Sequence, residues 1–231
     1  MIYLAIALGF LPSFAWLLFY LREDSKHPEP RLLIAGTFIL GAVATLLAFY
    51  AELHLSDLWS NLHILDYSPL HFLSFSAVEE IAKFAAAYFL VRRSRYFDEP
   101  VDAMVYMITA ALGFAAVENI GAAVQGWQEL ASFTSVFHTV TLRFIGATLL
   151  HSLSSGLVGF YWARGINSQE EGWFVFEGLI VATLLHAFFN FLIINISAVI
   201  VPTMLLLVIG LLVLHDFDKL KVMPLFSRFF S

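Results

Sequence analysis

The 231-residue sequence contains no cysteine and few charged residues. Without cysteine the chain cannot form a disulfide, a thiolate metal site or a thiol nucleophile, and it has no acceptor for palmitoyl or prenyl groups. Charged residues make up only 13% of the chain, the net charge is −6, and lysine and arginine form no run that could follow phosphates. No nucleic-acid partner is therefore expected.

Apolar residues dominate what remains. They make up 60% of the sequence, with a mean hydropathy of +0.83, whereas a soluble domain has about 45–50%. A transmembrane helix needs about 20 mainly apolar residues. Seven segments qualify, and they cover residues 2–21, 32–50, 69–91, 103–125, 137–162, 173–195 and 197–214. The sequence predicts an all-α, polytopic transmembrane helical bundle in which residues 1–231 form one membrane-embedded domain, with the first segment retained as a span.

The basic residues are concentrated in alternate loops. No basic residue lies in the other loops, which are the segments 51–68 and 126–136 and the short sixth loop. Because lysine and arginine are retained on the cytoplasmic side, we expect the N-terminus outside and the C-terminus in the cytoplasm. Ten of the twelve basic residues lie between spans or after the last one: Arg22, Lys26, Arg31, Arg92, Arg93, Arg95, Arg164, Lys219, Lys221 and Arg228.

Five charged residues fall inside the predicted spans. Glu79, Glu80 and Glu118 are carboxylates, whereas Lys83 and Arg143 are bases. Each costs about 2.5–3.5 kcal/mol on membrane-insertion scales, so such residues usually face the bundle interior and mark a functional site. One carboxylate is left without a base, and it must be protonated, paired with a histidinium or bound to a cation. Lys83 is within reach of both neighbouring glutamates.

Uncharged polar residues accompany these charges. Asn119 follows Glu118, His151 lies in the fifth predicted span, and His186 and Asn190 share one face of the sixth. Peptide hydrolysis by water requires a group that deprotonates water and donors that stabilise the oxyanion. The polar set supplies both kinds of group, although structural ion pairs and hydrogen bonds between helices would use the same residues.

The predicted topology also gives the depth of these groups. At about 1.5 Å per residue, Glu79 lies about 14 Å from the outer end of its span, Glu118 about 10 Å and His186 about 14 Å. His151 comes out deeper, at about 20 Å. Three of the four groups are therefore expected at one level in the outer half of the bilayer, and His151 does not fit a straight fifth span.

These motifs resemble the PrsW family of intramembrane proteases, which is related to the type II CAAX prenyl proteases and, more distantly, to the scaffold subunit of gamma-secretase. The second motif here is FxxxE, from Phe114 to Glu118, where CAAX proteases have FxxxH, and this difference favours PrsW. The resemblance rests on His151 and on five segments: LREDSKHPEP, EEIAK from Glu79, DEPVDAMVY from Asp98, GFAAVEN from Gly113 and HAFFN from His186.

The resemblance implies a role for each site residue. Glu79 matches the glutamate that activates water, and Glu80 matches its essential neighbour. His186 and Asn190 match the pair that stabilises the oxyanion. Glu118 and His151 match the middle motifs, and Lys83, Asn119 and Arg143 are interpreted as supporting residues.

The resemblance also implies a substrate and a location. The substrate would be a single-span membrane protein, such as an anti-sigma factor, which is cut near the outer side of the membrane. The lipid bilayer is the other expected partner, and the location would be a bacterial or archaeal cell membrane.

Three alternatives remain at the level of sequence. No cofactor is predicted for glutamate-activated water, but zinc would suit a metal-dependent protease whose ligands come from Glu79, Glu118, His151 and His186. A non-catalytic membrane scaffold, like that of gamma-secretase, would use the same polar cluster for structure. A small-solute transporter would more often show discontinuous helices and two pseudo-symmetric halves, and the sequence shows neither.

Overall fold

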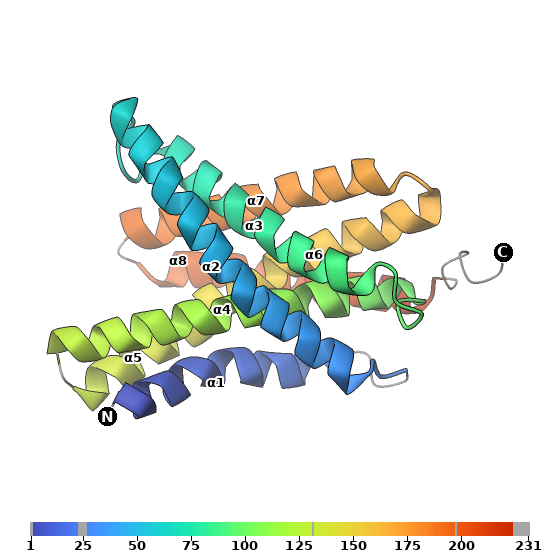
Figure 1. Ribbon diagram of the computed structural model, residues 1–231, viewed down its shortest axis with the longest axis horizontal. Coiled ribbons are helices and arrows are strands. Elements are labelled where there is room, and N and C mark those ends of the chain that lie inside the picture. Colours follow the sequence, from blue (N-terminus) through green and yellow to red (C-terminus); the bar gives the residue numbers. More distant parts are fainter. Residues whose placement is uncertain (1, 23–26, 131, 197, 224–231) are drawn as a thin grey trace.

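The computed structural model describes residues 2–22, 27–130, 132–196 and 198–223 (Figure 1). Within these residues the secondary structure is helical, without strands. The helices are α1 (Ile2–Tyr20), α2 (Arg31–Asn61), α3 (Pro69–Val91), α4 (Pro100–Leu130), α5 (Phe133–Ile145), α6 (Ala147–Ser168), α7 (Glu171–Asn195) and α8 (Ile200–Lys221).

The helices have the length and composition of a membrane bundle. Six segments in the described residues are long and apolar enough to cross a membrane, with α5 and α6 counted together as the segment Phe133–Ser168. The α3 helix is not among these six because it carries Glu79, Glu80 and Lys83, but it packs within the bundle against α2 and α7. The predicted all-α transmembrane bundle is confirmed, whereas its orientation stays a prediction.

Two predicted outer loops are mostly helical. The α2 helix continues to Asn61 and α4 to Leu130, so most of the segments 51–68 and 126–136 were wrongly predicted as loops. Each helix has 31 residues and is therefore about 46 Å long, against a hydrocarbon core of about 30 Å. Hydropathy falls where a helix leaves lipid, and the helical backbone does not have to end at that point.

The predicted span 137–162 is interrupted. Gly146 has φ −98° and ψ −96°, which is not helical, and it separates α5 from α6. Val136 and Val140 of α5 pack with Ala5 and Ala123 in a small cluster of their own. The predicted break before the last span is confirmed, because α7 ends at Asn195 and α8 begins at Ile200. Lys26, Ser197 and Arg228, which the predictions used, lie outside the described residues.

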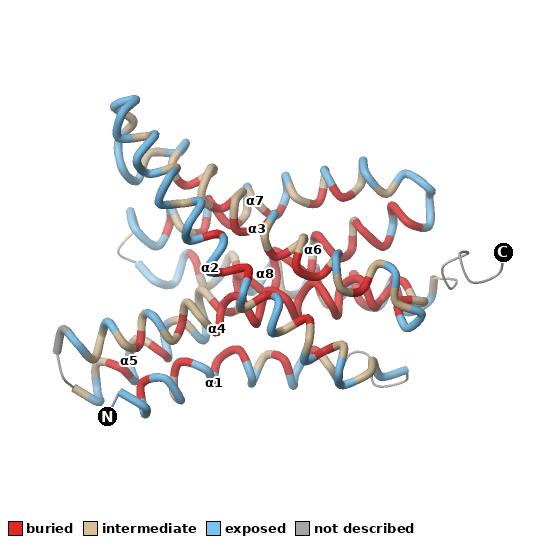
Figure 2. The backbone as a smooth tube through the Cα atoms, viewed as in Figure 1, coloured by how far each residue is buried: buried red, intermediate tan, exposed pale blue. Residues whose placement is uncertain are grey.

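The α4 helix forms the centre of the bundle. It packs against α1, α2 and α6, and 94% of its most apolar stretch is buried. The first half of α4 is accordingly red in Figure 2, whereas its second half is mostly tan and pale blue. Gly41 of α2 lies against the backbone of Ala110, and Gly113 of α4 lies against that of Phe38. Small residues let helix backbones approach this closely in membranes, and this contact fixes the register of α2 on α4.

The segment DEPVDAMVY, residues 98–106, fixes the start of α4 through hydrogen bonds. Asp102 Oδ2 accepts hydrogen bonds from the backbone N–H groups of Asp98, at 3.0 Å, and Glu99, at 2.8 Å. One turn further along, the hydroxyl of Tyr106 donates a hydrogen bond to Glu29, just before α2. The segment therefore ties the first turn of α4 to the chain that leads into α2.

Candidate active site

Four helices bring the two glutamates and Lys83 of α3 together with Glu118 and two histidines. Glu79, Glu80 and Lys83 come from α3, Glu118 from α4, His151 from α6 and His186 from α7. Glu80 and Lys83 are fully buried, and Glu79, His151 and His186 are at most 9% exposed. Ionisable groups are held at this depth only when they pair with one another, so the pairs between them define the site.

Lys83 binds one of the two adjacent glutamates more closely than the other. Its Nζ atom lies 2.8 Å from Oε1 of Glu80 and 3.5 Å from Oε2 of Glu79. The same ammonium group lies 4.8 Å from the centre of the Phe114 ring, over its face, where the ring attracts a cation. Lys83 therefore neutralises Glu80 first.

Glu80 is saturated with hydrogen bonds. Its Oε1 atom accepts from Ser154 Oγ at 2.9 Å and lies 2.8 Å from His186 Nδ1, in addition to its bond with Lys83. Its Oε2 atom accepts from Ser155 Oγ at 3.4 Å. A carboxylate bound on every side in this way is suited to holding its neighbours in place, and it has little capacity left for a substrate.

Glu118 forms a second set of pairs. Its Oε2 atom lies 2.8 Å from His151 Nε2 and 3.1 Å from Arg143 Nη2. Asn119 supports this arrangement, because its Oδ1 accepts from Arg143 Nε at 2.5 Å and its Nδ2 donates to Thr148 Oγ1 at 2.9 Å. Arg143 belongs to α5, so the helix before Gly146 also contributes to the site.

The pairs fix the tautomers of both histidines. His151 Nε2 faces the Glu118 carboxylate and is assigned as the donor, so Nδ1 accepts from Lys83 Nζ at 2.7 Å. His186 Nδ1 faces Glu80 and is also assigned as a donor, which leaves its Nε2 with a lone pair. In each ring, one nitrogen is held by a carboxylate and the other bears a lone pair. In His151 this lone pair accepts from Lys83, and in His186 it makes no hydrogen bond to the described residues.

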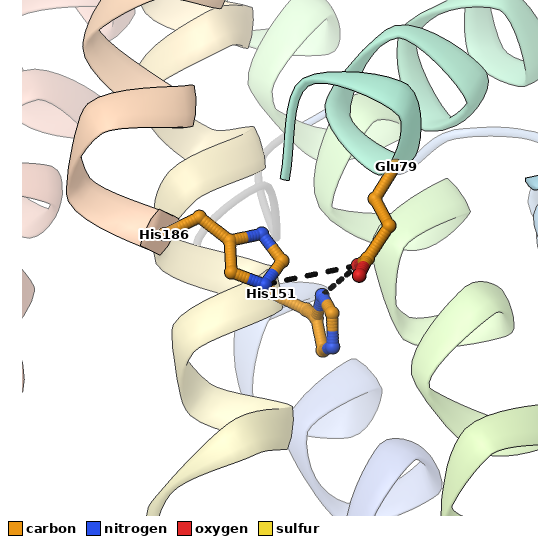
Figure 3. A group of neighbouring side chains, drawn as sticks. All are labelled: Glu79, His151 and His186. Atoms are coloured by element: carbon orange, nitrogen blue, oxygen red, sulfur yellow. Dashed lines mark ion pairs between the residues drawn. The ribbon is translucent and has the colours of Figure 1, made fainter. Parts of the chain in front are cut away.

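Glu79 faces both of these lone pairs. Its Oε2 atom is buried, has no hydrogen-bond partner in the described part of the chain, and lies 3.7 Å from His151 Nδ1 and 3.7 Å from His186 Nε2 (Figure 3). One ligand atom from each of the three residues lies within 4.8 Å of the others. Carboxylate oxygen and imidazole nitrogen are ligands that zinc prefers, so this set of atoms fits a divalent cation as well as a polarised water molecule.

Comparisons with known proteins show the family of this chain. The model of the PrsW family intramembrane metalloprotease matches residues 29–214. The chain belongs to the PrsW family. "Protease PrsW" of Oceanobacillus iheyensis is 27% identical over 87% of this chain and 90% of its own. The Bacillus subtilis protein of that name is 27% identical over 83% and 84%, and that of Geobacillus kaustophilus is 24% identical over 81% and 78%. No solved structure matches.

The structure gathers nearly all residues that the PrsW resemblance implied. Glu79, Glu80 and Lys83 contact the two histidines directly. Glu118 joins them through His151, and Asn119 and Arg143 support Glu118. His151 joins the others because the helical backbone is interrupted at Gly146, so a depth counted along one straight span does not apply. Asn190 is partly buried on α7, one turn from His186, and its side chain makes no hydrogen bond to other described residues.

The sequence did not reveal every residue around this PrsW site. The hydroxyls of Ser154 and Ser155 bind Glu80, and neither serine was among the predicted site residues. Thr148 supports Asn119 in the same way. The spacing of His151 and Ser155, four residues apart on one helix face, is the signal that could have identified the second serine.

Proposed function

We propose that this chain is an intramembrane endopeptidase that hydrolyses one peptide bond of a membrane-anchored protein with water activated at Glu79. The observation that supports this most directly is the buried Glu79 Oε2 atom, which has no hydrogen-bond partner among the described residues and faces two imidazole nitrogens at 3.7 Å. Glu79 Oε2 is in an ion pair with Lys83 at 3.5 Å but accepts no hydrogen bond from the described residues, so it is free to take a proton from water. Glu80, which is bound on every side, is not.

The proposed reaction moves one proton twice. Glu79 takes a proton from the water molecule, the water oxygen attacks the carbonyl carbon of the substrate, and the bond from that carbon to nitrogen breaks. The proton on Glu79 then passes to the leaving amine. Asn190, whose side chain makes no hydrogen bond to other described residues, would donate to the developing oxyanion. His186 would also donate, from Nε2, once that nitrogen takes up a proton in place of the lone pair assigned above.

The other charged residues keep the reacting groups oriented. Glu80 orients the ring of His186 through Nδ1, and Lys83 neutralises Glu80. Glu118 orients the ring of His151 through Nε2. Both imidazoles therefore present their second nitrogen to Glu79 with the ring held in place.

A metal-dependent form of the same peptidase is the second candidate. The three converging acceptor atoms favour it, and the matching family model is described as a metalloprotease. Glu79, His151 and His186 would hold a divalent ion such as zinc, which acts as a Lewis acid and makes bound water more acidic. His151 Nδ1 would then bind the ion in place of its hydrogen bond from Lys83. Glu118, which the sequence suggested as a fourth ligand, would instead orient His151, as carboxylates commonly do behind metal-bound histidines.

We infer the substrate class from the depth of the site. The polar groups were placed in the outer half of the bilayer by topology, so a single-span protein, such as an anti-sigma factor, would be cut near the outer surface. The three relatives come from bacteria, which supports a bacterial cell membrane as the location.

Cleavage of single-span proteins by the purified protein in lipid vesicles tests the proposal. Wild type should cleave at least one member of a panel, and Glu79→Gln should not. Asp57→Asn is the matched control, because Asp57 is an exposed carboxylate on α2. Cleavage by Glu79→Gln at the wild-type rate would show that Glu79 is not the base. Failure of the wild type on a broad panel would favour a scaffold.

The same assay decides between the two forms of the peptidase. The preparation is stripped with a chelator, and its metal content is measured before activity is tested. Full activity in a verified metal-free sample would remove the metal-dependent candidate. Activity that is lost on stripping and returns with zinc would establish it.

A further inference from the structure

Glu52 lies on the part of α2 that the sequence analysis placed outside the membrane bundle. Ala44 and Ala48 of α2 are buried against the core, and Glu52 follows Ala48 by four residues. Residues four apart lie on one face of a helix. The Glu52 side chain is partly exposed, and its Oε1 atom is fully buried. The carboxyl group therefore continues the stripe of α2 that faces the bundle.

Two contacts place Glu52 at the level of the candidate active site. Thr45 Oγ1 donates to the backbone oxygen of Phe114 at 3.1 Å, and Glu52 lies seven residues beyond Thr45. Glu118 lies four residues beyond Phe114 on α4. This helix runs in the same direction as α2 (Figure 1), because the contacts of Gly41 with Ala110 and of Thr45 with Phe114 advance by four residues on both helices. At about 1.5 Å per residue, the two carboxylates differ in level by about 5 Å.

The contact between α2 and α3 also places Glu52 at the level of the candidate active site. Trp59 Nε1 donates to Ser74 Oγ at 3.0 Å. Glu52 lies seven residues before Trp59, and Glu79 lies five residues after Ser74, on the next helix of an antiparallel hairpin. Their levels differ by about 3 Å. Consistent with both registers, Glu52 interacts electrostatically with Glu118, Lys83 and Glu79.

The Oε1 atom of Glu52 has no hydrogen-bond partner in the described residues. The hydrogen bonds of Glu118 go to His151 and Arg143, and those of Lys83 go to Glu80 and His151. A buried acceptor without a donor is costly, by about 1–3 kcal/mol, and the cost is recovered when a ligand brings the donor. The reaction brings one, because a membrane helix must unwind locally before its backbone can be cut, and unwinding frees backbone N–H groups that lipid cannot satisfy.

We propose that Glu52 is a substrate-binding residue whose Oε1 atom accepts a hydrogen bond from a backbone N–H next to the cleaved bond. This inference rests on the proposed peptidase function. It adds a binding contact from α2, a helix that contains none of the segments on which the PrsW resemblance rests. The contact requires only an acceptor oxygen, so glutamine can replace glutamate at this position.

A coupling experiment with synthetic single-span peptides tests the contact. Each peptide carries one ester in place of one amide, at a position that flanks the cleaved bond, so that one backbone N–H is removed at a time. Loss of one such hydrogen bond lowers kcat/KM about tenfold. At one position the ester should cause this loss in wild type and in Glu52→Gln, and no further loss in Glu52→Leu.

Three variants complete the experiment. Glu52→Leu should lower kcat/KM on the all-amide peptide about tenfold, and Glu52→Gln should stay within about twofold of wild type. Asp57→Leu should match wild type, because Asp57 is exposed on the same helix. Abundance and thermal unfolding are measured for each variant. If Glu52→Leu is not stably folded, Glu52→Met replaces it in the same cycle.

The outcomes separate this inference from the proposed function. If the ester lowers kcat/KM as much in Glu52→Leu as in wild type at every position, the proposed role of Glu52 is overturned. The loss of cleavage in Glu79→Gln would still support the peptidase function. Equal loss of activity in Glu52→Gln and Glu52→Leu also overturns the role of Glu52, because the charge or the proton would then matter instead of the acceptor. No cleavage by wild type overturns the proposed function and this contact together.

Discussion

The Nζ atom of Lys83 lies 2.8 Å from the Oε1 atom of Glu80, and neither side chain is exposed. This ion pair gives the two adjacent glutamates of α3 different environments. Glu80 is fixed between Lys83, His186 and the serines of α6, whereas Glu79 Oε2 has no hydrogen-bond partner among the described residues. The pair therefore separates a carboxylate that is held by hydrogen bonds from the one that we propose to activate water.

Substitution of Glu80 should lower stability much more than substitution of Glu79. Glu79→Gln should lower the cleavage rate at least about 100-fold, as loss of a general base does, with little change in thermal unfolding. Glu80→Gln leaves Lys83 without its closest counter-charge in the interior, and loss of one partner of a buried ion pair costs about 3–5 kcal/mol. Thermal unfolding in detergent and cleavage in vesicles measure the two effects.

A double substitution serves as the control for this ion pair. In Glu80→Leu with Lys83→Met, both charges are removed, so the loss of stability should be smaller than the sum of the two single losses. Additive losses would mean that Lys83 and Glu80 stabilise the fold independently. Equal stability of Glu79→Gln and Glu80→Gln would contradict the assignment of different duties.

Zinc binding should depend on the three converging residues if the metal-dependent candidate is correct. Wild type should take up one equivalent, and Glu79→Gln, His151→Ala and His186→Ala should lose it. Glu118→Gln should bind about 10- to 100-fold more weakly, because Glu118 orients His151. Calorimetry and thermal shift with added zinc measure this without an activity assay. His54→Ala, which changes an exposed histidine of α2, is the control, and equal binding by Glu79→Gln would exclude this site.

Sequence periodicity and charge were sufficient for the bundle and for most of the site. An ionisable residue within an apolar span has a cost that only other polar groups offset, so Glu79, Lys83, Glu118 and His186 could be assigned to one cluster without coordinates. The partner of Lys83 could not be assigned, because residues three and four positions away on a helix are both within reach. Only the side-chain geometry distinguishes 2.8 Å from 3.5 Å.

Other features could not be predicted from the sequence, for a different reason. Hydropathy reports contact with lipid, so it ended the second span at residue 50 and excluded Glu52 from the bundle, although α2 continues to Asn61. The interruption at Gly146 lies in an apolar stretch, where hydropathy does not change. Contacts between helices, such as Ser154 with Glu80, depend on the rotation of each helix, which a single sequence does not fix.

The carboxyl group of Glu29, which precedes α2, should make the fold less stable as the pH rises. Burial raises the pKa of this carboxyl above its ordinary value of 4.5, and the hydrogen bonds from Tyr106 and Asp102 only partly oppose that effect. The folded chain therefore binds a proton more tightly than the unfolded chain, and its stability decreases as pH rises from about 4.5 through the raised pKa. Glu29→Gln carries no charge, so it should lose less stability over this range.

Thermal unfolding at about pH 5 and about pH 8 measures this difference between wild type and Glu29→Gln. Other groups titrate in both proteins and cancel in the comparison. Glu170→Gln, which changes an exposed carboxyl between α6 and α7, should follow wild type. A larger decrease in Glu29→Gln than in wild type would reverse the sign and show that the charged form is the one stabilised.

Close contact between α2 and α4 should be the most sensitive packing feature of the bundle. A Cβ atom added at Gly41 would overlap the carbonyl group of Ala110, and one added at Gly113 would overlap that of Phe38. Backbone atoms cannot turn aside, so Gly41→Ala and Gly113→Ala must separate the helices, at a cost of about 1–3 kcal/mol. The separation would also move Glu52 away from Glu118, so cleavage should decrease together with stability.

Gly121→Ala is the matched control for this contact. It lies on the same helix as Gly113, and an added Cβ there meets nothing within 4 Å. Because alanine favours the helix over glycine by up to about 1 kcal/mol, this variant should unfold at the same temperature as wild type or higher, with unchanged cleavage. If Gly41→Ala and Gly121→Ala unfold at the same temperature, the contact of Gly41 with Ala110 does not fix the register of α2, and the level assigned to Glu52 from that register fails with it.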